Sequence, residues 1–175
     1  MEQVLPPSTA SGAGFEATRV RQFTVFLENR VGRLMALLRA LEETDQRIYG
    51  LSIEESADAA LVRVIVSDPD AAKPFLKQKG FSLSVTEVLC LELPREAKHP
   101  LQAICSCLLS GELNLHYTYP MHQGPTGPAI VVYVDDPTLA ARILINRGFR
   151  ILSEGDLRVN SPDGPDDFEP PDETE

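Results

Sequence analysis

Residues Asn29 to Leu34 place an amide, two guanidinium groups and a glycine where an expected strand meets an expected helix. The amide of Asn29 can donate and accept hydrogen bonds, which suits a ligand with both an ammonium and a carboxylate group. Gly32 lacks a Cβ and lets a ligand approach the backbone, and the N–H groups at a helix start attract anions. These features suit a small-molecule site, but taken alone they are more typical of an ordinary turn with a turn asparagine, a hinge glycine and solvated arginines.

The other residues able to do chemistry form no catalytic pattern. No spacing among them matches a zinc site or a nucleophile–histidine–acid triad. They are His99, His116, His122, Cys105 and Cys107. The segment from His122 to Pro128 has two glycines but lacks the lysine of a phosphate-binding loop. We therefore predict that the protein is not an enzyme and uses no metal or cofactor.

Charge and hydropathy exclude two further classes of partner. The net charge is -10, but seven acidic residues with no accompanying base lie after Asn160, so the body is nearly balanced. Nucleic acid requires a basic face, and an RNA-binding sheet needs stacking aromatics that Leu61 to Val66 does not supply. No apolar run reaches the ~18 residues of a membrane span, and the first residues do not resemble a signal peptide. We expect a cytoplasmic protein without nucleic-acid or membrane partners.

The chain contains an internal repeat. The segment VIVSDPDAA at 64–72 returns as VYVDDPTLA at 132–140, and KGF at 79–81 returns as RGF at 147–149, both at an offset of 68. A helical stripe matches at an offset of 67: Leu34, Leu37, Leu38 and Leu41 correspond to Leu101, Ile104, Cys105 and Leu108. Several collinear matches indicate a duplicated domain.

Each half predicts the order strand, helix, strand, strand, helix, strand. Expected strands are 22–27, 48–53, 61–66, 81–87, 88–93, 115–119, 129–134 and 149–157, and expected helices are 34–41, a segment after Asp68-Pro69, 101–109 and 136–147. Such βαββαβ units are α+β and ferredoxin-like, with two helices on one face of an antiparallel sheet. We expect the two sheets to join edge to edge as one antiparallel eight-stranded sheet, with the face opposite the helices left for a partner. The domains would be 21–87 and 88–158, flanked by disordered segments 1–20 and 159–175.

The stretch FLENRVGRLMALLRAL, with N-R-x-G-x-L after a strand inside a duplicated βαββαβ unit, resembles the ACT domain family. The resemblance covers roughly 21–158 and implies two ACT repeats side by side, a regulatory module that binds amino acids. Because no catalytic domain accompanies them, the chain looks like a stand-alone tandem ACT protein.

In that family a ligand binds between the first loop of one domain and the start of the second strand of the other. The resemblance therefore implies a site formed by Asn29, Arg30, Val31, Gly32, Arg33, Leu34 and Asn114. In the other repeat His99 and Pro100 replace Gly32 and Arg33, with Arg47 in place of the partner asparagine. We expect this second site to be weak or lost, because Pro100 has no N–H to donate. The same difference suggests that the fold alone does not require Gly32.

The resemblance implies a non-catalytic amino-acid sensor, and the sequence leaves the amino acid and the regulated pathway open. The alternative is an interaction or dimerisation module that regulates a metabolic enzyme without a ligand of its own. Expected partners are a small amino acid and a second copy in a homodimer, with that enzyme as a further candidate.

Overall fold

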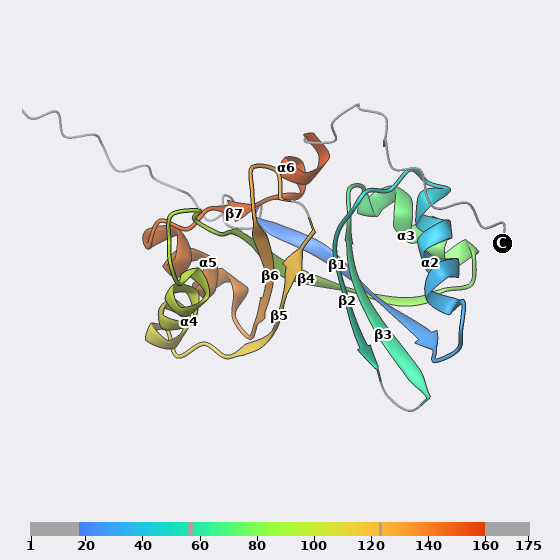
Figure 1. The fold of residues 1–175 in the computed structure, drawn as a ribbon, viewed down its shortest axis with the longest axis horizontal. Helices are drawn as coiled ribbons and strands as arrows, with labels where there is room; N and C mark the ends of the chain where they lie inside the picture. Colours follow the sequence, from blue (N-terminus) through green and yellow to red (C-terminus); the bar gives the residue numbers. More distant parts are fainter. Residues whose placement is uncertain (1–17, 56–57, 123, 160–175) are drawn as a thin grey trace, which may run out of the picture.

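The computed structural model describes residues 18–55, 58–122 and 124–159 of the 175-residue chain. The strands are β1 Arg19–Glu28, β2 Ile48–Glu55, β3 Ala59–Val66, β4 Ser82–Glu92, β5 Leu115–Met121, β6 Ala129–Val134 and β7 Ile151–Leu152. The helices are α2 Arg33–Glu42, α3 Pro69–Gln78, α4 Pro100–Ser110, α5 Pro137–Asn146 and α6 Glu154–Val159. Figure 1 shows two lobes, with α2 and α3 on the outside of one and α4 and α5 on the outside of the other. The duplicated ferredoxin-like plan is confirmed.

Each lobe has its own apolar core between its helices and its part of the sheet. In the first lobe, Leu37 and Leu41 of α2 pack with Val62 and Val64 of β3. In the second, Ile104 and Leu108 of α4 take the corresponding places. Helical spacing on one side and strand alternation on the other give matching apolar faces, which explains why the stripe was readable in the sequence.

The expected single eight-stranded sheet is wrong. The sheet has seven strands in the order β1-β3-β2-β5-β6-β4-β7, and an additional β1–β4 pairing closes six of them into a ring. The cause is β4, which is one continuous strand across the expected boundary at Glu87. Its first part, Ser82 to Leu89, pairs with β1, and its last part, Leu89 to Glu92, pairs with β6. The two sheets therefore face each other, and a single pairing of Gly50 with Met121 joins β2 to β5.

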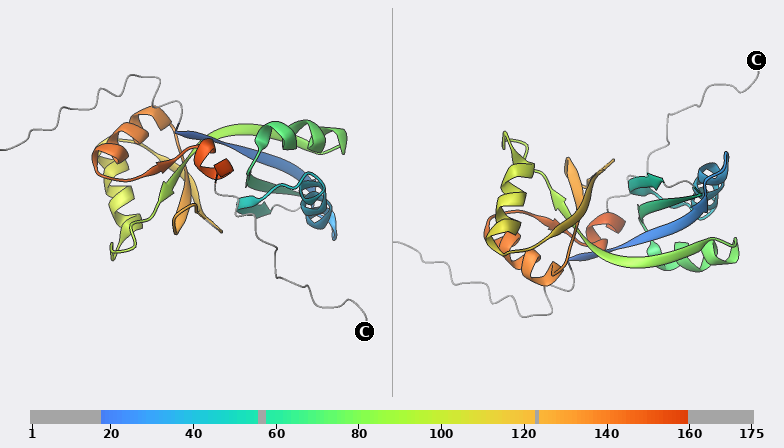
Figure 2. Two further views of the ribbon diagram at one scale, coloured as in Figure 1. Left: turned by 90° about the horizontal axis from the view of Figure 1, so that it is seen from above. Right: turned by 90° about the horizontal axis from the view of Figure 1, so that it is seen from below.

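The sheet faces opposite the helices are not left open for a partner. They enclose a third core in the middle of the ring, formed by Val20, Tyr49, Ile65, Val88, Cys90, Tyr119, Met121, Ala129, Val131, Leu152 and Leu157. Seen from above and below, the strands lie between the two outer pairs of helices (Figure 2). Burial of both inner faces within one chain removes the apolar surface that the sequence assigned to another molecule.

The last expected strand, 149–157, is also wrong, because only Ile151–Leu152 pairs with β4 and α6 follows. Ser153 and Asp156 form a reciprocal helix cap: the Ser153 N–H donates to the Asp156 carboxylate at 2.7 Å, and the Asp156 N–H donates to Ser153 Oγ at 3.2 Å. This S-x-x-D capping box was present in the sequence and is a helix-start signal. Leu157 is buried, and its carbonyl accepts a hydrogen bond from the Tyr49 hydroxyl.

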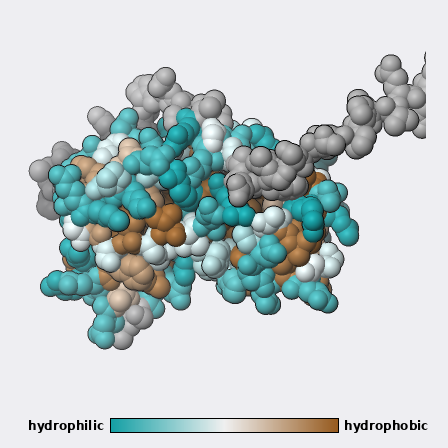
Figure 3. Space-filling view, turned by 180° about the vertical axis from the view of Figure 1, so that it is seen from behind, coloured by the Kyte–Doolittle hydropathy of each residue, from teal (hydrophilic) through white to brown (hydrophobic). Residues whose placement is uncertain are grey.

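The segments expected to be disordered lie almost entirely outside the described residues. Arg19 and Val20 belong to β1, and Val159 ends α6. No helix in the described parts is long and apolar enough to cross a membrane. Seen from behind, both lobes carry apolar patches within a largely hydrophilic surface (Figure 3). The exposed large apolar residues are Phe26, Val31, Met35, Ile53, Val85, Leu101, Leu109 and Ile145.

Candidate functional site

The turn between β1 and α2 holds most of the residues predicted to bind a ligand. Gly32 is the residue before the helix, with a left-handed backbone at φ 87°. Its carbonyl accepts the first helical hydrogen bond, from the Ala36 N–H at 2.9 Å, and the Arg33 N–H donates to the Arg30 carbonyl at 3.2 Å. Nothing lies within 4 Å of the position where a Cβ would be at Gly32. The turn thus combines a glycine conformation with open space around it.

The first helix of each repeat begins without a side-chain cap, unlike the second. Asp68 accepts from the backbone at the start of α3, and Asp136 does so for α5. Neither Gly32 before α2 nor His99 before α4 makes such a bond. The α2 start therefore keeps backbone donors and the positive end of the helix dipole available to an anion.

The suggestion that the fold does not require Gly32 needs correction. His99 has φ -137°, a negative value that residues with a Cβ readily adopt, whereas Gly32 has φ 87°. The two turns differ in conformation, so tolerance of histidine in one says nothing about the other. Glycine at position 32 has a local conformational cause, because a left-handed backbone is costly for residues with a Cβ.

The side chains around Gly32 differ in their surroundings. Val31 is fully exposed, at 106% of its reference area. Arg30 pairs with Glu28, and this hydrogen bond holds the pKa of the Glu28 carboxyl below its ordinary value. Arg33 is half-buried, and its Nε has no hydrogen-bond partner among the described residues. The Asn29 backbone N–H donates to the Asp58 carbonyl at 3.3 Å, which ties the turn to the end of the β2–β3 hairpin.

The structure does not bring Asn114 to this turn within one chain. Asn114 precedes β5, and its Nδ2 donates to Asp135 Oδ2 at 3.4 Å. Figures 1 and 2 place the β1–α2 turn and the α4–β5 turn in opposite lobes. The residues of the expected second site, Arg47 and His99, are divided between the lobes in the same way. Closure of the ring explains both separations, because it turns the first helix of each repeat outward.

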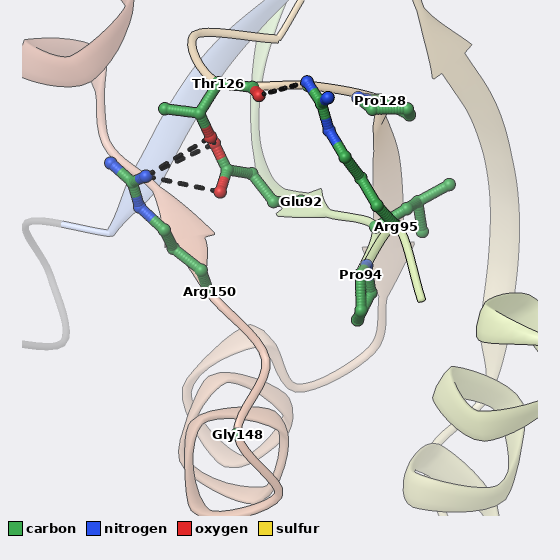
Figure 4. Close-up of a pocket in the computed structure, with 9 residues that line it drawn as sticks. Glu92, Pro94, Arg95, Thr126, Pro128, Gly148 and Arg150 are labelled. Carbon is green, nitrogen blue, oxygen red and sulfur yellow. Dashed lines mark hydrogen bonds and ion pairs between the residues drawn. The ribbon is translucent and has the colours of Figure 1, made fainter. Parts of the chain in front are cut away.

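A hollow lies beside the loop at 124–128, where no sequence motif indicates a binding site. It has a volume of about 270 Å³ and lies at the end of the second lobe where β4, the β5–β6 loop and the α5–β7 turn meet (Figure 4). Its lining includes Glu92, Arg95, Thr126 and Arg150. Glu92 and Arg95 are neighbours in the sequence, but Thr126 and Arg150 come from distant segments, so no local motif could have identified the hollow.

The described residues contain no group of histidine, cysteine and acidic side chains able to hold a metal ion. Burial raises the pKa of the Cys90 thiol well above its ordinary value, which makes it a poor nucleophile. Cys107 is also buried, and Cys105 is exposed.

Comparison with known proteins identifies the architecture. The sequence model of a family described as an ACT domain pair matches residues 18–159. No curated protein matches the chain. Protein BT0572 from Bacteroides thetaiotaomicron is 27% identical, with a TM-score of 0.74, over 81% of this chain and 97% of that one.

Two further solved structures share the fold at low identity. The regulatory subunit of aspartate kinase from Thermus thermophilus, in a ligand-free form, is 10% identical with a TM-score of 0.50, over 73% of this chain and 91% of that one. Aspartokinase alpha and beta subunits give 13% identity and a TM-score of 0.50, over 74% and 92%.

Proposed function

Because the chain belongs to the ACT domain pair family, we propose that it is a non-catalytic regulatory protein that binds a small amino acid at the β1–α2 turn. The observation that carries this proposal is the start of α2, which has no side-chain cap and opens from a left-handed glycine in open space. The ligand carboxylate would accept from the backbone N–H groups of Val31, Gly32 and Leu34, because the Arg33 N–H already donates to the Arg30 carbonyl. Asn29 would hydrogen-bond the ammonium end, and Arg30 and Arg33 would add positive charge.

We propose further that Asn114 of a second copy completes this site. Within one chain the two asparagines lie in opposite lobes, so a homodimer is the arrangement that would bring an Asn29 turn against an Asn114 turn. Exposed Val31 and Met35 beside the turn would be covered by such an interface. By analogy of fold alone with a regulatory subunit of aspartate kinase, the assembly would act on an enzyme of amino-acid metabolism.

A thermal-shift screen with the twenty amino acids tests the proposal. A ligand at 100 times its Kd adds ~2.7 kcal/mol to the free energy of unfolding, which raises Tm by several degrees. Asn29→Ala should abolish the shift, and Asn146→Ala, an exposed asparagine at the end of α5, should leave it unchanged. If no amino acid raises Tm, or if Asn29→Ala retains the shift, the proposed site is wrong.

The second-copy arrangement has its own test. Molar mass measured by light scattering should correspond to two chains in the presence of the ligand, and Asn114→Ala should weaken binding. A monomer that binds the ligand with unchanged affinity after Asn114→Ala would exclude the shared site while leaving the turn itself as the binding element.

An interaction module without a ligand is the second candidate. Its support is the exposed apolar surface, above all Leu109 at 78% exposure at the end of α4. A single exposed leucine needs no partner, but contiguous apolar patches such as those in Figure 3 are typical of a surface with one. Dimerisation in the absence of every amino acid, unaffected by any of them, would favour this function.

A further inference from the structure

The hollow at the end of the second lobe has the form of a small binding site. Figure 4 shows Glu92 and Thr126 between two guanidinium groups, with Arg150 on one side and Arg95 on the other. Leu93, Pro94 and Pro128 supply apolar walls. A volume of about 270 Å³ lies just below the roughly 300–1,000 Å³ of clefts that take drug-sized ligands, so the space suits a small metabolite.

The acidic group of this hollow is fixed in place. Glu92 is the last residue of β4, and its side chain is only 15% exposed. Its backbone N–H donates to the Arg150 carbonyl at 3.0 Å, and its carboxylate accepts from the Thr126 hydroxyl. Glu92 is therefore a positioned acceptor held by strand pairing.

The basic groups keep unused capacity. Arg150 reaches the Glu92 carboxylate only at 3.3 and 3.4 Å and Asp156 at 3.4 Å, beyond the 2.7–2.9 Å of a strong charge-assisted bond, and its side chain is 51% exposed. Arg95 donates from Nη2 to the Thr126 carbonyl at 2.9 Å, its one hydrogen bond among the described residues. A guanidinium carries five donors, so several on each arginine are available to a ligand.

A glycine lets Arg95 lie across the loop. A Cβ at Gly127 would stand 3.2 Å from Arg95 Nε and 3.3 Å from Nη2, closer than ordinary van der Waals contact. The loop backbone and the guanidinium are thus in direct contact, and the arginine is held over the hollow.

The first repeat shows that the fold does not require these charges. The β1–β4 pair Val25 and Leu83 matches the β4–β7 pair Leu91 and Ile151, since each pair faces the core of its own lobe. At the next position along these strands, the first repeat pairs Phe26 with Ser82. The second repeat places Glu92 beside Arg150 at the equivalent position. The same ladder position carries no charge in one repeat and an acid and a base in the other.

We propose that this hollow binds a small carboxylic acid that also carries a hydrogen-bond donor next to the carboxylate. The carboxylate would be held by Arg95 and Arg150, and the donor, an ammonium or a hydroxyl group, would bond Glu92. Two guanidinium groups with Glu92 and Asp156 sum to no net charge, which disfavours a simple anion and favours a ligand with both functions. α-Amino acids and 2-hydroxy acids share this chemistry. The inference does not rest on the amino-acid site proposed above, since the two share no residue.

Titration followed by ¹⁵N–¹H correlation spectra of the full chain tests this directly, with L-alanine, L-lactate, propionate and inorganic phosphate as probes. We expect L-alanine or L-lactate to cause saturable shifts of the amides of Arg95, Thr126, Gly127 and Arg150. The probe that binds more tightly shows whether the ligand is an α-amino acid or a 2-hydroxy acid. Propionate lacks the donor and phosphate lacks the carboxylate, so both should bind at least several-fold more weakly. Equal binding of all four, or no saturable shift at these amides, would overturn the proposal.

Variants separate this site from the β1–α2 turn. Arg95→Gln and Arg150→Gln should each weaken binding by about tenfold or more, because each removes charge-assisted hydrogen bonds. Arg147→Gln, at the end of α5 and exposed, is the matched control and should have no effect. Asn29→Ala should also leave the shifts intact. Shifts confined to residues 29–34 and lost in Asn29→Ala would refute this site and retain the other.

Discussion

The hydroxyl of Tyr119 donates to Oε1 of Gln22 at 2.8 Å, joining the second repeat to the first in the middle of the ring. Gln22 is fully buried and is the one buried polar or charged residue in the described part of the chain. Its Nε2 donates to the Tyr117 hydroxyl at 2.9 Å, so the amide is used at both ends. A satisfied polar contact of this kind fixes how two apolar faces are aligned, because any slip leaves buried groups unpaired.

Tyr119→Phe should therefore destabilise the protein out of proportion to the single atom removed. The Gln22 oxygen would stay buried without its donor, which costs about 1–3 kcal/mol. Urea unfolding followed by circular dichroism measures this change. Tyr133→Phe is the control, because the Tyr133 hydroxyl has no hydrogen bond among the described residues, and equal losses from the two variants would contradict the assigned role.

Gly32→Ala should destabilise the fold by about 1–2 kcal/mol, the cost of a left-handed backbone for a residue with a Cβ. No steric term adds to this, since the position is open. Gly155→Ala, inside α6, is the matched substitution at a helical position and should be neutral or stabilising. The two unfolding free energies, compared in the same denaturant series, give the difference. Equal effects would mean that the backbone at position 32 is not the cause.

Stability should fall in acid partly through Glu154. Arg21 donates from Nε to Glu154 at 2.8 Å, and this bond holds the pKa of the Glu154 carboxyl below its ordinary value. A carboxyl with a lowered folded pKa contributes stability above its unfolded pKa, and the contribution disappears as pH falls through the folded pKa. The pair is partly exposed, so the expected contribution is about 1 kcal/mol or less.

Glu154→Gln should accordingly be less stable than the parent at neutral pH, with a difference that disappears below the folded pKa of Glu154. Unfolding free energies from about pH 7 down to about pH 2 measure this. Glu96→Gln, at an exposed position in the turn before α4, is the comparison variant. A constant difference at every pH would rule out titration of Glu154 as the cause.

The three cysteines should react with thiol reagents at very different rates. Cys105 is exposed, whereas Cys90 lies in the closed ring core with a pKa raised by burial. A colorimetric disulfide reagent should therefore label one thiol per chain quickly under native conditions and all three in denaturant. Rapid native labelling of Cys90 would show that the ring opens.

Local signals in the sequence predicted most of the elements. Asp68 followed by Pro69 predicted the start of α3, and the Asp68 side chain does accept from the helix backbone. The helix then continues through Pro74, at the cost of one backbone hydrogen bond. The leucine stripes of α2 and α4 were readable because amphipathic periodicity is a local property.

The arrangement of the elements was not readable in the same way. The residue types of 81–93 favour a strand throughout. They do not indicate whether that strand pairs within one sheet or with two. The capping box at Ser153 could have identified α6, but the apolar residues before it, Ile151 and Leu152, favoured a longer strand. The candidate site illustrates the same limit, since the Asn29 turn has its expected local setting while its expected partner Asn114 lies in the other lobe.

By itself the sequence determined the duplication, the βαββαβ order of each half, the cores under the helices and the glycine turn before α2. All of these depend on contacts between residues close in the chain or on a repeated pattern. Only the tertiary structure decided that β4 is shared, that the inner faces close on each other around Gln22, and that Glu92, Arg95 and Arg150 meet in one hollow. These depend on strand twist and on burial between distant segments, which no local pattern encodes.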